Sequence, residues 1–286
     1  MKHVLEIRTH THQRPAARLI LIALLAAIFA MPVRPAVAQT ATTLGSAESF
    51  AALAGPAVTC TDSIITGDVG VWPGTAITQT NCSINGTTHA GDGIAKLAYI
   101  DFLSAYNALA LKPCDQVLSS GNLAGLTLTP GVYCVDAAST TTGGTLTLVG
   151  SSTDTWIFKI GTGGGGALTG TGLTVVMTSG ETCNNNVFWW TAQAATLTDS
   201  VFIGSILAGT SITVTGGSLD GQALATVAVT LTGANVFDCG NVSPPKKPKA
   251  NEGVGNGVDG NTPGHLHNGG NDDPAYSPGN PGAKHK

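Results

Sequence analysis

The sequence predicts a mainly β fold in which the chain winds into a solenoid with one helix beside it. Three observations support this prediction. Thr-x-Thr pairs recur at even intervals of 17 residues, in the segments 195–198, 212–215 and 229–232. A fixed short period of this kind is typical of turns that stack one on another. Glycine-broken β-prone runs make up most of the remaining chain, and a single segment has helical spacing.

Short β-prone runs broken by Gly and Pro extend from Leu44 to Asn85, and the pattern becomes helical at about 89–111. There the apolar residues form one stripe, which consists of Ile94, Ala98, Phe102, Ala105 and Leu109. Pro113 ends the run, as is typical just past a helix. We expect this helix to pack on the sheet of its own domain rather than on a membrane or a partner.

After Cys114 the sequence alternates candidate strands with glycine-rich breaks. Strands are expected at 145–149, 156–160, 173–177, 187–190 and 201–207. The longest break, Gly161–Gly166, lacks the GK[ST] ending of a phosphate loop, so we interpret it as a turn region.

The 17-residue repeat supplies the candidate binding surface. Side chains alternate faces along a strand, so if Leu197, Val214 and Leu231 point inward, the threonines beside them point outward on one face. These are Thr196, Thr198, Thr213, Thr215, Thr230 and Thr232. They would form a stiff grid, spaced about 6.6 Å along a strand and about 4.7 Å between strands. Such a grid suits a regular ligand such as ice or a polysaccharide fibre, although threonine is also simply a good strand residue.

The two ends of the chain differ in composition from its middle. Arginines precede the short apolar stretch 19–30, and Ala36-Val37-Ala38 supplies a small-x-small cleavage pattern, so 1–38 is read as a secretory signal peptide. An uncleaved N-terminal anchor is the alternative. No span is expected in the mature protein, which we expect to be secreted and extracellular.

The division of the chain follows from this pattern. A short N-terminal segment, 39–43, precedes a solenoid domain at 44–240. The remainder, 241–286, is a Gly/Asn/Pro-rich tail with almost no apolar residue and is expected to be disordered. It indicates association with a cell-surface or matrix component as a second possible partner.

The net charge argues against anionic partners. Between Leu44 and Gly240 the chain has three lysines and twelve acidic residues, a net of nine negative charges. Binding to nucleic acid or to an anionic membrane is therefore not expected. No cofactor and no metal site is expected either.

Six cysteines lie in the exported part, and an even number in a secreted chain favours disulfides. They are Cys60, Cys82, Cys114, Cys134, Cys183 and Cys239. Fifteen connectivities are open, of which nearest-neighbour pairing (60–82, 114–134, 183–239) is our hypothesis. Zinc is a poor alternative because the chain has no CxxC.

Catalysis finds little support in the residues. The only histidine of the folded region, His89, falls at the expected helix start, and no Gly-x-Ser-x-Gly elbow is present. Polysaccharide-cleaving solenoids need carboxylates gathered on one face. Asp199, Asp220 and Asp238 occupy different positions in the repeat, although the last two could still approach at a corner. The chain is therefore not expected to be an enzyme.

Several ordered motifs resemble those of the microbial ice-binding-protein-like family, a family of the domain-of-unknown-function type. They cover about 44 to 239 and lie at 44–55, 65–75, 89–92 with the following helix through 105–109, 128–133, 156–161, 186–189 and 203–213. The resemblance implies a right-handed, triangular, discontinuous β-solenoid with one long α-helix packed alongside. It also implies that one flat face adsorbs to ice through outward Thr, Ser and Ala residues.

The function that the resemblance implies is a secreted, antifreeze-like protein that limits ice growth or recrystallisation. No short motif carries over residue by residue, so the choice of face rests on the 17-residue repeat, and the other two faces stay open. A structural or adhesive surface protein on the same scaffold is the alternative function.

Overall fold

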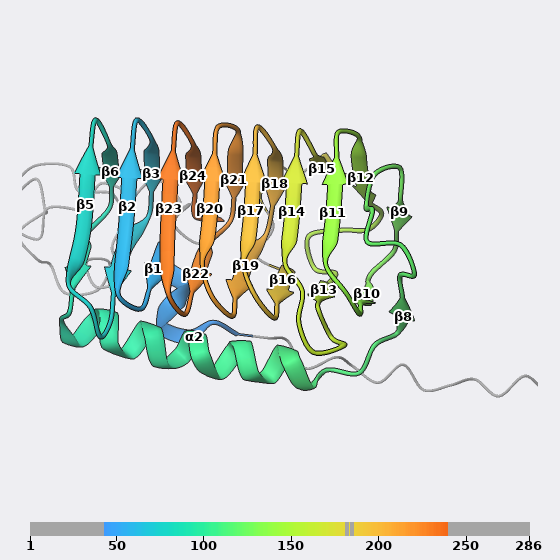
Figure 1. Ribbon diagram of the computed structural model, residues 1–286, viewed down its shortest axis with the longest axis horizontal. Helices are drawn as coiled ribbons and strands as arrows, with labels where there is room; N and C mark the ends of the chain where they lie inside the picture. The colour runs from blue at the N-terminus through green and yellow to red at the C-terminus, as the bar shows by residue number, and fades with distance from the viewer. Residues whose placement is uncertain (1–42, 181–182, 184–185, 240–286) are drawn as a thin grey trace, which may run out of the picture. The chain divides into compact units, whose positions relative to one another are not determined.

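The structure is a computed structural model, and it describes residues 43–180, 183 and 186–239. The expected signal peptide at 1–38 and tail at 241–286 lie outside the described residues, as does nearly all of the segment 39–43. Within the described part the chain forms one short 3-10 helix, η1 (Gly45–Ser49), one α-helix, α2 (Gly93–Leu111), and strands that all pair in parallel in three sheets. The fold is thus mainly β, and the three sheets form the three sides of a β-solenoid. Figure 1 shows its successive coils side by side.

Each sheet takes one strand from successive coils. Sheet A contains, in spatial order, β7 (Thr88–Ala90), β4 (Asp68–Val71), β1 (Phe50–Ala54), β22 (Ala223–Ala225), β19 (Ser205–Ala208), β16 (Val187–Thr191), β13 (Trp156–Ile160), β10 (Gly131–Val135) and β8 (Gln116–Val117). Sheet B contains β11 (Ser139–Thr142), β14 (Leu168–Thr171), β17 (Ala195–Thr198), β20 (Ile212–Thr215), β23 (Ala228–Thr232), β2 (Ala57–Thr61) and β5 (Ala76–Thr80). Sheet C contains β6 (Ser83–Asn85), β3 (Ile64–Thr66), β24 (Asn235–Phe237), β21 (Ser218–Asp220), β18 (Val201–Ile203), β15 (Thr174–Met177), β12 (Thr145–Leu148) and β9 (Thr127–Leu128).

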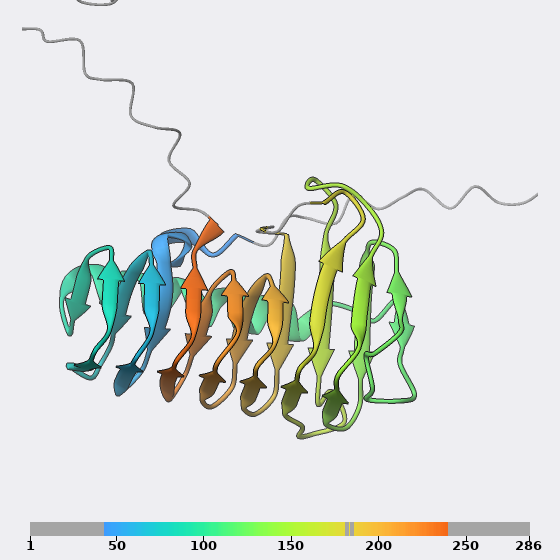
Figure 2. The same cartoon turned by 90° about the horizontal axis from the view of Figure 1, so that it is seen from above.

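The order of coils in space differs from their order in sequence. The chain makes its first coils with β1 to β7, and α2 then runs along the solenoid toward the other end (Figures 1 and 2). From there β8 to β24 wind back until β22, β23 and β24 pair with β1, β2 and β3. The solenoid is therefore discontinuous, with a seam where its last coil meets its first.

A single buried glutamine joins the two sides of the seam. The Gln222 side-chain amide donates to the carbonyls of Ala47, Glu48 and Phe50 at 2.8, 3.1 and 3.0 Å. Its Oε1 accepts from Ser205 Oγ at 2.9 Å. Because Gln222 is only 3% exposed, these bonds replace those that water would otherwise make.

Aromatic residues fill one end of the solenoid interior. The rings of Tyr133, Phe158, Trp189 and Phe202 follow one another with centroid separations of 5.6, 4.0 and 4.6 Å. All four are buried, and sheet A supplies the first three. The expected strand 201–207 is broken here at Gly204, which has φ 103° and where a Cβ would meet the backbone of Val187.

The helix α2 covers the outer side of sheet A. Its buried residues are Ala95, Ala98, Phe102, Ala105 and Leu109. The last four pack on outward side chains of sheet A such as Leu53, Phe188 and Leu207. By length and composition alone α2 could cross a membrane. In the solenoid, however, Tyr99 and Tyr106 donate to the backbone carbonyls of Thr226 and Thr191, and burial raises the pKa of both phenols.

Two details of the predicted helix are wrong. Ile94, expected in the buried stripe, is 55% exposed, and Ala95 takes its place. His89 does not start the helix but lies buried in β7, because the helix begins only after Asp92. Asp92 is the N-cap: its Oδ1 accepts from Ala95 N and its Oδ2 contacts His89 Nδ1, both at 2.8 Å.

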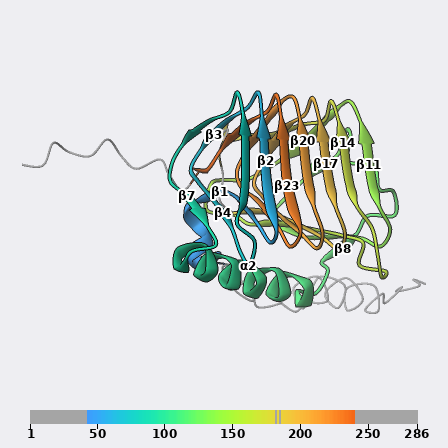
Figure 3. The ribbon, with the colours of Figure 1, turned by 60° about the vertical axis from the view of Figure 1, so that its left-hand side comes forward.

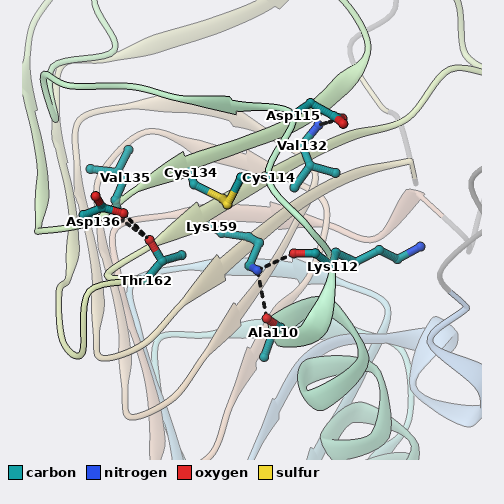
Figure 4. The surroundings of a disulfide bond; sticks show 10 residues. All are labelled: Ala110, Lys112, Cys114, Asp115, Val132, Cys134, Val135, Asp136, Lys159 and Thr162. Carbon is teal, nitrogen blue, oxygen red and sulfur yellow. Dashed lines mark hydrogen bonds between the residues drawn. A yellow bond between two sulfur atoms is a disulfide. The ribbon is translucent and has the colours of Figure 1, made fainter. Parts of the chain in front are cut away.

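The other end of α2 is fixed by a lysine from sheet A (Figure 4). Lys159 Nζ donates to the carbonyls of Ala110 and Lys112 at 2.8 and 2.6 Å, where a helix presents unpaired carbonyls. Burial lowers the pKa of this amine.

The cysteines form three disulfides with nearest-neighbour pairing, as the sequence hypothesis had it. Cys60 pairs with Cys82, Cys114 with Cys134 and Cys183 with Cys239. The Cys114–Cys134 disulfide lies near the C-terminal end of α2 and joins the segment after the helix to β10 (Figure 4).

Candidate functional site

Sheet B carries two unbroken columns of threonine on its outer side. In the register of the seven strands, each threonine is directly opposite a threonine of the next strand. One column consists, in spatial order, of Thr140, Thr169, Thr196, Thr213, Thr230, Thr59 and Thr78. The other consists of Thr142, Thr171, Thr198, Thr215, Thr232, Thr61 and Thr80. We call these fourteen residues the threonine face, and Figure 3 shows most of its strands side by side.

The threonine face is open and uncharged. None of its threonines is buried, whereas the residues that alternate with them are buried on every strand except the terminal β5. No strand of sheet B contains an acidic or basic residue. Over the described residues, none of the fourteen hydroxyls bonds to another protein group, so all of them are available to water.

The scaffold holds this face in place before any ligand arrives. Parallel ladders fix the strands, while buried residues such as Val58, Leu197 and Val214 anchor their inner sides. Threonine adds a side chain with few χ1 rotamers. The spacing follows from sheet geometry, about 4.7 Å between strands and about 6.6 Å between alternate residues along one strand.

The six threonines predicted from sequence occupy the three neighbouring strands β17, β20 and β23, as the 17-residue offset implied. Sequence reasoning missed the other eight because the offset is not constant. Thr59 and Thr78 are 19 residues apart, Thr169 and Thr196 are 27 apart, and the seam places Thr59 beside Thr230. A search for Thr-x-Thr pairs at any spacing would have found them, together with false matches such as 145–147 in sheet C.

The other two faces of the solenoid are different in kind. Sheet A is covered by α2, as described above. Sheet C is not covered by the helix, and one of its outward columns reads Thr145, Thr174, Val201, Ser218, Asn235, Ile64 and Ser83. Five residue types thus occupy seven equivalent positions, and no uniform surface results.

Over the part of the chain that the structure describes, the titratable groups do not gather in a catalytic arrangement. Asp220 lies opposite Ile203 and Phe237 rather than another carboxylate, and burial raises its pKa. His89 and Asp92 serve the helix N-terminus, where the Ala95 N–H and the His89 ring lower the pKa of Asp92. Among the described residues no three side chains of the His, Cys, Asp and Glu types gather as metal ligands.

Comparison with known proteins places this geometry among related molecules. The model of the ice-binding-like family matches residues 52–237. A curated relative, the ice-binding protein of Nostoc sp. (strain HG1), is 38% identical over 206 residues, which are 70% of this chain and 73% of the relative. The ice-binding protein of Flavobacterium frigoris (strain PS1) is 36% identical over 200 residues, 63% of this chain and 70% of the relative.

Solved structures give the same result. An ice-binding protein from an Antarctic biological consortium has a TM-score of 0.64 and 37% identity, covering 72% of this chain and 95% of that one. The ice-binding protein of the Antarctic ascomycete Antarctomyces psychrotrophicus has a TM-score of 0.63 and 32% identity, covering 69% of this chain and 98% of that one. The family model, the curated relatives and the solved structures agree, and the chain belongs to the ice-binding-like family.

Proposed function

We propose that this protein binds ice through the threonine face and so limits ice growth or recrystallisation. The observation that supports the proposal is the pair of seven-residue threonine columns, uncharged and free of internal hydrogen bonds. The names of the relatives point the same way, since those quoted above are ice-binding proteins.

The mechanism is surface adsorption rather than catalysis. Each threonine offers a hydroxyl that bonds to water and a methyl group that does not, repeated at the nearly constant spacing of a parallel sheet. Water beside such a grid takes up a regular arrangement that the ice lattice can accept. Because the face is held rigid by the solenoid, adsorption does not have to restrict many side chains, which lowers its entropic cost. The ice surface can then advance only between the adsorbed protein molecules, where it has to curve.

The proposal includes export. Three disulfides are typical of proteins in an oxidising compartment. Cleavage of residues 1–38 would leave Gln39 as the first residue of the secreted protein, and N-terminal sequencing of that protein tests this boundary. A start at Met1 would contradict it.

Ice-affinity partitioning tests the function. The purified, disulfide-intact protein is mixed with a soluble protein of similar size, and the solution is slowly frozen onto a cold finger. We expect this protein to be enriched in the ice while the second protein stays in the liquid, and single ice crystals grown in its presence should become faceted. Equal exclusion of both proteins from the ice, with the fold intact by circular dichroism, would overturn the proposal.

A further inference from the structure

The three sheets end together at one coil of the solenoid. Strands β5, β6 and β7, which span residues 76–90, are the terminal strands of sheets B, C and A respectively. Each has a described neighbour on one side only, β2, β3 or β4. Figure 1 shows β5 and β6 at this end, which we call the β5 end.

The free backbone groups of β5 can be identified from its bonds to the preceding coil. Gly74 N donates to Gly55 O at 3.1 Å, and Thr80 O accepts from Asp62 N at 2.9 Å. Since the backbone groups of successive residues in a strand point to opposite edges, the even-numbered residues face β2. The N–H and C=O of Ile77 and Gln79 therefore point away from the sheet, as a row that another strand can pair with.

The β5 end lacks the features that usually protect a strand edge. Natural edges carry charged side chains, prolines or bulges that prevent pairing with another chain. From Gly74 to Ala90 there is no Lys, Arg, Asp, Glu or Pro. Four of the five residues of β5 are exposed, whereas the inner positions of β2 are buried.

The opposite end of sheet B is covered by the chain itself. Beyond β11, Gly121 O accepts from Ser139 Oγ at 2.7 Å, and Leu123 N donates to Thr141 Oγ1 at 2.9 Å. Among the described residues, the two ends of the same sheet thus differ, and of these two it is the β5 end that is left for a partner.

We propose that the partner is a second copy of this chain, docked end to end at the β5 end about a two-fold axis perpendicular to sheet B. Such an axis places β5 antiparallel to β5 of the second copy, with Thr78 opposite Thr78. Ile77 then lies opposite Gln79 of the other copy, and these residues exchange both of their N–H···O bonds.

Self-complementarity is the reason to assign a second copy rather than an unrelated peptide. In this register all the edge-facing groups of both Ile77 and Gln79 find partners, and residues 74–90 carry no Asp, Glu, Lys or Arg to oppose the contact. The same axis brings β6 opposite β7 of the second copy, so the edges of all three sheets meet. The outward threonines of the two copies would then form one surface of twice the length. The inference does not depend on what that surface binds.

Sedimentation velocity over a concentration series tests the dimer. The full secreted chain should convert from monomer to dimer as concentration rises. Gln79→Lys places like charges at the paired edges and should abolish the dimer at concentrations where the parent is dimeric. The matched variant Thr142→Lys, on the terminal strand at the covered end, should leave the dimer intact, with circular dichroism confirming both folds. A monomer at every concentration, or equal loss of dimer in both variants, overturns the proposal.

A cysteine trap tests the register. In a non-hydrogen-bonded antiparallel pair the Cα atoms are about 4.5 Å apart, within the range that a disulfide spans. Thr78→Cys should therefore form a covalent dimer under mild oxidation, and Thr142→Cys should not. If instead removal of residues 240–286 is needed before any dimer forms, the tail covers the β5 end and the proposal is wrong.

Discussion

Sheets B and C are built from the same coils, yet only sheet B presents a uniform surface. Both consist of short parallel strands in register, and neither is covered by α2. Sheet C accepts Val201, Ser218, Asn235 and Ile64 at four successive positions of one column. The equivalent positions of sheet B hold threonine without exception.

The fold therefore does not require threonine at outward positions. A solenoid coil tolerates branched, polar and small residues there, as sheet C shows within the same molecule. Fourteen threonines on one side therefore exceed what strand propensity explains, and a property of the surface explains them better. This internal comparison supports the proposed function independently of the relatives.

The largest expected effect is on the free energy of unfolding, and it tests whether sheets B and C depend on the same seam. Gln222→Leu leaves the carbonyls of Ala47, Glu48 and Phe50 without their side-chain donor at the seam that both sheets cross. We expect a loss of about 3 kcal/mol in the free energy of unfolding, because buried polar groups lose their partners. Denaturant unfolding measures it, with the exposed Gln116→Leu as a control expected to change little. A Gln222→Leu variant as stable as the parent would show that the seam does not rest on this residue.

The second effect concerns position within the threonine face. Thr213 lies on the central strand β20 and Thr140 on the terminal strand β11. A tyrosine on the central strand prevents close contact with ice on both sides of it. A tyrosine on the terminal strand leaves the other six strands free to contact ice. We expect Thr140→Tyr to reduce ice-recrystallisation inhibition clearly less than Thr213→Tyr. Equal losses would indicate that a smaller or different part of sheet B is used.

A smaller effect is expected at the covered face, where Asp92 caps α2. The pKa of Asp92 is lowered in the folded state, so its contribution to stability is present above the ordinary pKa of 3.8 and is lost as the pH falls through the lowered value. Asp92→Asn should lower the melting temperature slightly at pH 7, and the difference should shrink at pH 2. A difference independent of pH would contradict this role of the carboxylate.

The smallest effect is expected on sheet C. Asp220 is half-buried with a raised pKa, and burial is the cause of the shift, so its ionised form is unfavourable in the folded state. Its contribution to stability is present below the ordinary pKa of 3.8 and is lost as the pH rises through the raised value. Asp220→Asn should therefore raise the melting temperature slightly at pH 7 without changing ice activity. A lower melting temperature would show that the carboxylate makes a favourable contact.

Much of this architecture could be predicted from sequence because the signals are local. The 17-residue offset gave the register of β17, β20 and β23, and cysteine spacing suggested the three disulfides. The helix was recognised from its periodicity, but Ile94 was misplaced because a hydrophobic residue at the first turn can remain in solvent.

The rest depends on contacts between distant segments. That β2 lies beside β23 follows from the path of α2, which no local pattern encodes. Eight threonines of the face were missed for this reason, since the loops between coils vary in length. Gln222 was not singled out, because its role appears only when residues 47–50 lie next to it.

The most direct test of the central claim compares one substitution on the two sheets. Thr213 in sheet B and Thr174 in sheet C are both partly exposed threonines facing outward from short parallel strands. Ice-recrystallisation inhibition is measured for Thr213→Tyr and Thr174→Tyr at equal concentrations, with melting temperatures showing that both are folded. We expect the Thr213→Tyr variant to need about tenfold more protein for the same inhibition, a loss of about 1.4 kcal/mol, and the Thr174→Tyr variant to match the parent. Equal activity of the two variants, or a loss confined to Thr174→Tyr, would contradict the assignment of the threonine face.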